Sequence, residues 1–207
     1  MFTDRYEAGK LLAEELANYK GKDAVVLAIP RGGLPVGAVI AKSLGLPLDI
    51  ALTKKIGHPF NKEYAIGAVS LNSIVLSEET GNVSPEYIAE ETENIRNLLL
   101  SRRDAYYKNK APSSIKDKTV ILVDDGIATG NTILATIKLI AQENPKHILV
   151  AAPVSPLSAI LKIEESPLVS EVLVLEQANN FHAIGPYYMD FNPITDQEAI
   201  KIFNSIK

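Results

Sequence analysis

The 207-residue sequence contains no cysteine and no tryptophan. Without cysteine, the chain cannot form a disulfide, hold a metal through thiolates or use a cysteine nucleophile. Long apolar runs are also missing: none approaches the roughly 20 residues that span a bilayer. Acidic residues interrupt the first segment, MFTDRYEAGKLLAEEL, so it lacks the apolar core of a secretory signal. We therefore expect a soluble cytoplasmic protein that does not contact membranes.

A strong excess of charge of either sign is absent as well. The chain has 21 basic and 25 acidic residues, a net charge of -4, so bulk electrostatic attraction to nucleic acid is not expected. Its 3 histidines are scattered along the chain, which argues against a transition-metal site built by the protein. The apolar content of 46% is typical of an ordered protein, and the length suits a single domain covering residues 1–207.

Short apolar runs alternate with helical patterns along the chain. Helices are predicted at 4–19, 34–45, 84–110, 131–142 and 156–165, with a last one capped by Thr195, and strands at 24–29, 48–55, 119–123, 147–152 and 171–176. The polar stretch GHPFNKE within 56–64 predicts a loop, followed by a short hairpin. The alternation predicts an α/β fold, an open and mainly parallel twisted sheet flanked by helices, with an irregular C-terminal lobe.

The segment DDGIATGNT follows the apolar run VILV, at a strand end where parallel sheets bind ligands. Its glycines, Gly126 and Gly130, permit close approach of a ligand. Hydroxyl and amide side chains beside a helix N-terminus, those of Thr129, Asn131 and Thr132, make an anion cradle. Two carboxylates would repel a phosphate but can accept hydrogen bonds from a vicinal diol. The segment therefore indicates a ribose carrying a phosphate; alternatively, Asp124 and Asp125 are only turn and cap residues.

A second glycine loop, Pro30–Gly33, follows the first predicted strand. Arg31 supplies a forked cation suited to phosphate oxygens, while Gly32 and Gly33 free backbone amides. An ordinary turn with a solvated arginine is the alternative. The run RGGLPVG does not have GxGxxG spacing, and Ala41 stands where a Walker A motif has glycine before Lys42 and Ser43. A dehydrogenase and an ATPase are therefore excluded.

The run VILVDDGIATGNT resembles the signature of type I phosphoribosyltransferases, which bind phosphoribosyl pyrophosphate. Three other segments, FTDRYEAGKLLAEEL, PRGG and KKIGHPFNKEYAIGAV, resemble a subgroup of predicted phosphoribosyltransferases of undefined acceptor. The resemblance implies that Asp124 and Asp125 contact the ribose hydroxyls and that the Arg31–Gly33 loop binds pyrophosphate. It assigns the rest of the phosphoribosyl site to Gly126, Ala128, Thr129, Gly130, Asn131 and Thr132.

The resemblance also implies a mobile loop and hairpin at about 54–80 and a hood at about 176–207. Lys54 and Lys55 are the first candidates to meet the leaving pyrophosphate, although lysines are also common on solvated turns. His58 is a weaker candidate for a general acid. Aromatic residues of the hood could stack on an acceptor ring or pack the lobe itself: Phe181, His182, Tyr187, Tyr188 and Phe191.

The resulting hypothesis is a phosphoribosyltransferase that moves the 5-phosphoribosyl group to a nitrogenous acceptor, expected to be a nucleobase, and releases pyrophosphate. Its expected catalytic residues are Asp124, Asp125, Arg31, Lys54 and Lys55. Magnesium is the expected cofactor, carried mainly by substrate and water, and the family suggests a homodimer. The alternative is a non-catalytic sensor of phosphoribosyl pyrophosphate or a nucleotide on the same fold. The PRGG loop and the lysine loop favour the enzyme.

Overall fold

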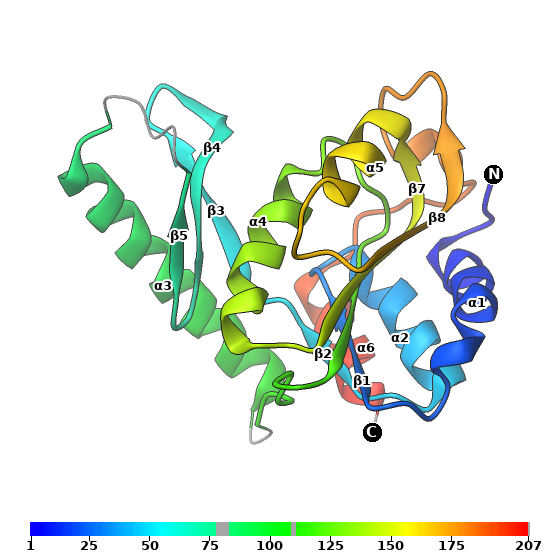
Figure 1. Cartoon of the computed structure of the whole chain (residues 1–207). Coiled ribbons are helices and arrows are strands. Elements are labelled where there is room, and N and C mark those ends of the chain that lie inside the picture. The colour runs from blue at the N-terminus through cyan, green and yellow to red at the C-terminus, as the bar shows by residue number, and fades with distance from the viewer. Residues whose placement is uncertain (78–82, 109–110, 207) are drawn as a thin grey trace.

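The computed structural model describes residues 1–77, 83–108 and 111–206. Its centre is a five-stranded sheet in which every neighbouring pair is parallel, in the order β2-β1-β6-β7-β8. The strands are β1 (Ala24–Ala28), β2 (Leu48–Ile50), β6 (Thr119–Val123), β7 (His147–Pro156) and β8 (Glu171–Ala178). The predicted α/β fold with a parallel sheet is confirmed (Figure 1).

Helices cover both faces of this sheet. One face packs against α1 (Arg5–Glu15), α2 (Gly33–Leu44) and α6 (Asp196–Ser205), and the other against α4 (Asn131–Ile140) and α5 (Leu157–Glu164). In β1, Val26 joins the first core and Val25 the second, and all five residues of the strand are buried. A strand buried on both faces reads as a continuous apolar run, which is why AVVLA was recognisable in the sequence.

The helix ends follow local chemistry. Asp4 caps α1 by accepting a hydrogen bond from the Glu7 amide, and Gly45 ends α2 in the left-handed conformation with φ 65°. Thr195 and Glu198 form the predicted cap of α6 as a capping box. The described residues also form short 3₁₀ helices: η1 (Ala17–Tyr19), η2 (Ala141–Glu143) and η3 (Gly185–Tyr187).

The segment after β2 leaves the central sheet and forms a second one. It consists of β3 (Thr53–His58), β4 (Asn61–Ser70) and β5 (Ile74–Leu76), paired antiparallel. The long helix α3 (Pro85–Tyr107) covers one face of this hairpin sheet, and α4 lies against the other (Figure 1). The hairpin sheet thus stands between two helices beside the central fold.

The predicted loop at 56–64 is wrong, because β3 and β4 continue through it and only residues 59–60 turn. Gly57 misled the interpretation: a Cβ at this position would lie 2.6 Å from the Lys62 carbonyl oxygen. The glycine therefore permits close approach of the paired strand rather than breaking it. The prediction of a single strand at 48–55 is also wrong. This segment is divided between β2 and β3, which belong to different sheets.

The C-terminal segment is divided between two places. Residues near Tyr188 and Phe191 pack with Phe2 of the N-terminal segment, whereas α6 packs against α2 and α3, with Phe203 against Tyr106 and Tyr107. Among the helices of the described ranges, none has both the length and the apolarity to cross a bilayer.

Candidate active site

The two glycine loops meet because the strands that precede them are neighbours in the sheet. β1 pairs with β6 up to Ala28 and Val123, so the Pro30–Gly33 loop and the acidic pair emerge side by side. A Cβ at Gly32 would lie 2.1 Å from Asp125 Oδ2, and one at Gly33 would lie 2.6 Å from the Val123 carbonyl oxygen. Only glycine fits so close to the acidic loop. The Pro30–Arg31 peptide bond is cis.

The loop after β6 borders a cavity of about 180 Å³. Gly130 has φ 75° and leads into the N-terminus of α4, a place where backbone amides remain free for an anion. Ile184 closes the cavity from the C-terminal segment, since a Cβ at Gly126 would lie 2.6 Å from its side chain. The lining consists of Asp124, Gly126, Ile127, Ala128, Thr129, Gly130, Thr132, Ile133 and Ile184.

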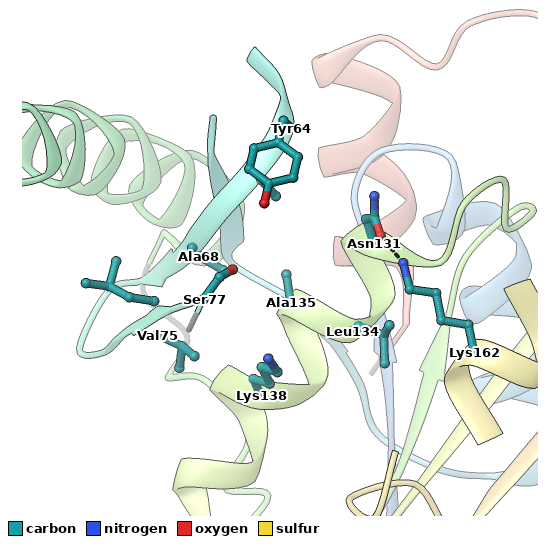
Figure 2. Close-up of a pocket in the computed structure, with 12 residues that line it drawn as sticks. Tyr64, Ala68, Val75, Ser77, Asn131, Leu134, Ala135, Lys138 and Lys162 are labelled. Atoms are coloured by element: carbon teal, nitrogen blue, oxygen red, sulfur yellow. Dashed lines mark hydrogen bonds between the residues drawn. The ribbon is translucent and has the colours of Figure 1, made fainter. Parts of the chain in front are cut away.

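Asn131 is the exception among the predicted phosphate-binding residues. Its side chain points away from this cavity and accepts a hydrogen bond from Lys162 Nζ at 2.6 Å. It borders a second cavity, between α4 and the hairpin sheet (Figure 2). The phosphate loop therefore separates two cavities.

The two aspartates have different surroundings. Asp124 borders the 180 Å³ cavity, and its Oδ1 accepts the Asp125 amide at 2.8 Å. Asp125 is 8% exposed, and its Oδ2 accepts a hydrogen bond from Arg5 Nε at 2.8 Å. Burial, followed by the negative charge of Asp125, raises the pKa of Asp124 well above its ordinary value, while Arg5 opposes the shift. Asp124 thus borders the cavity, whereas Asp125 is paired in the interior.

Arg5 is a site residue that the sequence interpretation missed. It also donates to the Asn192 carbonyl oxygen at 2.9 Å, and its guanidinium lies 3.9 Å from the centroid of the Phe191 ring. Its position held a signal, because Arg5 shares the buried face of α1 with Ala8 and Leu12. A charge on an apolar helix face requires a buried partner, and here the partner is Asp125.

The aromatic residues of the C-terminal segment mostly pack against one another. Tyr188 is buried, its hydroxyl donates to the Asp125 carbonyl oxygen at 2.6 Å, and its ring stacks on Phe191 at 4.9 Å. Phe181 stacks on Tyr187 at 6.1 Å, and His182 is exposed. Burial, more than the charge of Asp125, raises the pKa of the Tyr188 hydroxyl. Lobe packing accounts for Tyr188 and Phe191.

Arg31 turns from its loop toward the C-terminal helix. Its Nη1 lies 3.7 Å from Oδ1 of Asp196, the first residue of α6, and both side chains are largely exposed. An exposed pair of this kind contributes little stability. Arg31 is therefore held loosely, next to the two glycines that touch the acidic loop.

The two candidate lysines lie on opposite faces of the hairpin sheet. Lys54 pairs with Val69, which packs into the core under α3, whereas Lys55 pairs with Ala68, which borders the cavity next to α4. Neighbouring residues on a strand point to opposite faces, so the two side chains cannot serve the same ligand. Neither one lines the 180 Å³ cavity.

Other polar groups of the hairpin have local partners. Lys62 donates to the Tyr87 hydroxyl at 2.6 Å and lies 3.7 Å from Glu91 on α3. Nδ1 of His58 accepts a hydrogen bond from the Phe60 amide at 3.2 Å. Within the described residues, no three His, Asp or Glu side chains come together as a ligand set for a metal.

Comparison with known proteins identifies a family. A model of the phosphoribosyl transferase domain matches residues 5–192. A Mycobacterium tuberculosis relative named "Putative phosphoribosyl transferase" is 32% identical over 204 residues, which is 97% of this chain and 46% of the relative. Nearly all of this chain is matched, but it spans only about half the length of the relative. Uracil phosphoribosyltransferase of Mycoplasma genitalium is 43% identical over 61 residues, 30% of this chain and 29% of that protein.

One solved structure is similar to this chain over nearly its whole length, and a second is similar at a lower level. The crystal structure of TT1426 from Thermus thermophilus covers 99% of this chain and 98% of its own, at 36% identity and a TM-score of 0.89. A hypothetical protein from Neisseria gonorrhoeae, solved with bound ppGpp, covers 97% of this chain and 92% of its own at 15% identity and a TM-score of 0.50. At that identity the second likeness is one of fold.

Proposed function

The chain belongs to the phosphoribosyltransferase family of pentosyl-transferring enzymes, and from this premise we propose the reaction that it performs. It transfers the 5-phosphoribosyl group of phosphoribosyl pyrophosphate to a nitrogenous acceptor, a nucleobase, and releases pyrophosphate. One observation carries the proposal: Asp124 borders the same cavity as the phosphate loop at the N-terminus of α4. An acceptor of hydroxyl hydrogens beside an anion cradle suits a ribose 5-phosphate.

The proposed roles follow from the surroundings of each group. Asp124 accepts hydrogen bonds from the ribose hydroxyls, while Asp125, paired with Arg5, supports the loop from the interior. The side chains of Thr129 and Thr132 bind the phosphate. The backbone amides of Gly126, Ala128 and Gly130 assist them, because these small residues let the phosphate come close to the backbone. This arrangement differs from the expectation that both aspartates contact the sugar.

The leaving group is assigned to the neighbouring loop. The bond from the anomeric carbon to pyrophosphate breaks as the acceptor nitrogen bonds to that carbon, through a transition state with oxocarbenium character. Arg31 and the amides of Gly32 and Gly33 stabilise the negative charge on the departing pyrophosphate. Since Lys55 lies on the α4 side of the hairpin sheet, it is the better candidate of the two lysines to assist them.

Magnesium is the proposed cofactor. The two aspartates do not form a complete set of ligands for magnesium, because Arg5 forms an ion pair with Asp125 and Asp124 is assigned to the ribose hydroxyls. This donor set fits an ion that retains water and is carried largely by substrate oxygens. When bound, magnesium neutralises charge on the pyrophosphate. We also propose that the protein acts in the cytoplasm as a homodimer.

The first test is binding. Phosphoribosyl pyrophosphate with magnesium should raise the melting temperature, because a ligand that binds only the folded state stabilises it by about 2.7 kcal/mol at 100 times its dissociation constant. The absence of a shift at saturating ligand contradicts the proposal. The matched control is Thr132→Val, which removes a phosphate donor of the cavity and should reduce the shift.

The second test is turnover. Pyrophosphate release is measured with a panel of purines, pyrimidines, pyridine carboxylates and small amines. Release with one acceptor class identifies the substrate. Binding without release for every acceptor would favour the sensor on the same fold.

A further inference from the structure

The second cavity, between α4 and the hairpin sheet, has the volume of a small-molecule site. It measures about 350 Å³, within the usual range for ligand pockets of about 300 to 1,000 Å³. Small residues on both walls leave the space open: Gly67 and Ala68 on the sheet, and Ala135 on the helix. In Figure 2, the side chains of Tyr64 and Ser77 project from the sheet side toward α4.

Among the described residues that line this cavity, the charged ones are cations. Lys138 of α4 and Lys162 of α5 both line it, and none of the described lining residues is acidic. In a chain with a net charge of -4, this local excess of positive charge selects an anion.

The remaining walls suit a planar apolar body. Leu134 of α4 and Val75 and Leu76 of β5 add apolar side chains to the lining, and Tyr64, which also lines the cavity, is 47% exposed. An aromatic ring can stack on tyrosine while its anionic substituent reaches the lysines. The ligand class is therefore a molecule that combines an aromatic ring with an anionic group, such as a nucleoside monophosphate.

The cavity is separate from the proposed substrate site, yet it touches the same loop. Gly130 and Thr132 line the 180 Å³ cavity, whereas Asn131 between them lines this one, and the two linings share no residue. Asn131 Oδ1 accepts from Lys162 Nζ at 2.6 Å. An anion that binds Lys162 competes with this bond and brings negative charge close to the phosphate loop.

We propose that this cavity is a second, regulatory site for an anionic aromatic ligand, and that its occupation weakens binding of the substrate phosphate. Binding at the cavity stands on its own observations, while the regulatory half rests on the proposed function. The coupling is repulsion between like charges on the two sides of one loop. By linkage it is reciprocal: a sugar phosphate weakens the second ligand by the same factor.

Binding is tested with the dye 8-anilinonaphthalene-1-sulfonate, an aromatic anion, followed by displacement with adenosine 5'-monophosphate. The double variant Lys138→Gln/Lys162→Gln should raise the dye's dissociation constant at least tenfold. Lys42→Gln is the matched control, because Lys42 lines an apolar groove along α2 and α6; it should bind the dye as the wild type does. Ala135→Phe keeps both lysines and fills the space, so it should also abolish binding. Unchanged affinity in both cavity variants, with circular dichroism showing them folded, overturns the site.

Coupling is tested by titrating ribose 5-phosphate with and without saturating dye. The dissociation constant should rise about fivefold or more, the lower end of typical coupling. The double lysine variant should lose this effect. Dye binding without any change in sugar affinity overturns the regulatory half. Failure of ribose 5-phosphate to bind even without dye contradicts the proposed function instead, and leaves the cavity result standing.

Discussion

Arg5 and Asp125 form an ion pair across 120 residues of sequence, with Nε and Oδ2 separated by 2.8 Å and the side chains 9% and 11% exposed. The pair joins the first turn of α1 to the loop that borders the 180 Å³ cavity. Tyr188 donates to the carbonyl oxygen of the same aspartate, and Gly32 touches its carboxylate. Asp125 is thus the point where four separate segments of the chain meet.

The first prediction concerns stability. Arg5→Met should lower the free energy of unfolding by about 3 to 5 kcal/mol, because it leaves a buried carboxylate without its partner. The double variant Arg5→Met/Asp125→Asn should recover most of the loss, since no uncompensated charge remains. Urea unfolding measures both. If the double variant is no more stable than Arg5→Met, loss of packing against Phe191, and not loss of the ion pair, explains the defect.

The second prediction separates the two aspartates. Asp124→Asn should reduce the preference for ribose 5-phosphate over its 2-deoxy analogue, because hydrogen bonds to a charged group contribute about 1.5 to 3 kcal/mol. Asp125→Asn should retain most of that preference, since its carboxylate faces Arg5. Calorimetric titration of both sugars gives the comparison. Equal loss of discrimination in both variants would restore a shared role for the pair.

A third prediction uses the raised pKa of Asp124, whose causes are burial and then the charge of Asp125, opposed by Arg5. Asp125→Asn removes a negative neighbour, so it should lower that pKa; Arg5→Met removes a positive one and should raise it. Tyr188, also near the pair, remains neutral because its own pKa is raised. The ¹³C chemical shift of the Asp124 carboxyl carbon, followed against pH, measures each pKa directly.

The same change should appear in ribose affinity, which requires the ionised form of Asp124. In Asp125→Asn this affinity should persist to a lower pH than in the wild type before it is lost. Shifts of the same sign in the two variants would refute this electrostatic account.

The fourth prediction concerns the contact of Arg31 with Asp196 at 3.7 Å. Pyrophosphate must compete with Asp196 for the guanidinium, so Asp196→Asn should tighten pyrophosphate binding. An exposed pair contributes at most about 1 kcal/mol, which limits the gain to roughly fivefold, and it should shrink at high salt. Glu198→Gln, further along α6 and engaged in the capping box, controls for damage to the helix start. Unchanged binding in Asp196→Asn would mean that Arg31 does not contact pyrophosphate.

Local signals made much of this architecture predictable. The buried run at Thr119–Val123, the cap at Thr195 and the glycine loops depend on neighbouring residues, and the structure has each where it was expected. The fold class followed from the alternation of such segments. Because ligands bind at the carboxyl ends of parallel strands, the residues after the strands also predicted that the two loops belong to one site.

What could not be predicted depends on contacts between distant segments. Nothing beside Asp125 in the sequence indicates that Arg5 will pair with it, so both aspartates seemed free to bind sugar. The hairpin sheet was misread for a related reason: Gly57 and the polar residues after it resemble a loop, and only the structure shows that Gly57 pairs with Ala65 and His58 with Asn61. Strand pairing with bulges leaves only a weak local pattern.

The Arg5–Asp125 pair also sets an order of events during synthesis. When Arg5 leaves the ribosome, its partner is 120 residues away in sequence, and the segment that supplies Tyr188 and Asn192 comes later still. Helix α1 therefore presents a guanidinium without its carboxylate partner while the residues up to Asp125 are still being translated. Contacts at such separation are slow to form, so the loop that bears Asp124 and Asp125 acquires all of these contacts only after the segment up to Asn192 has been made.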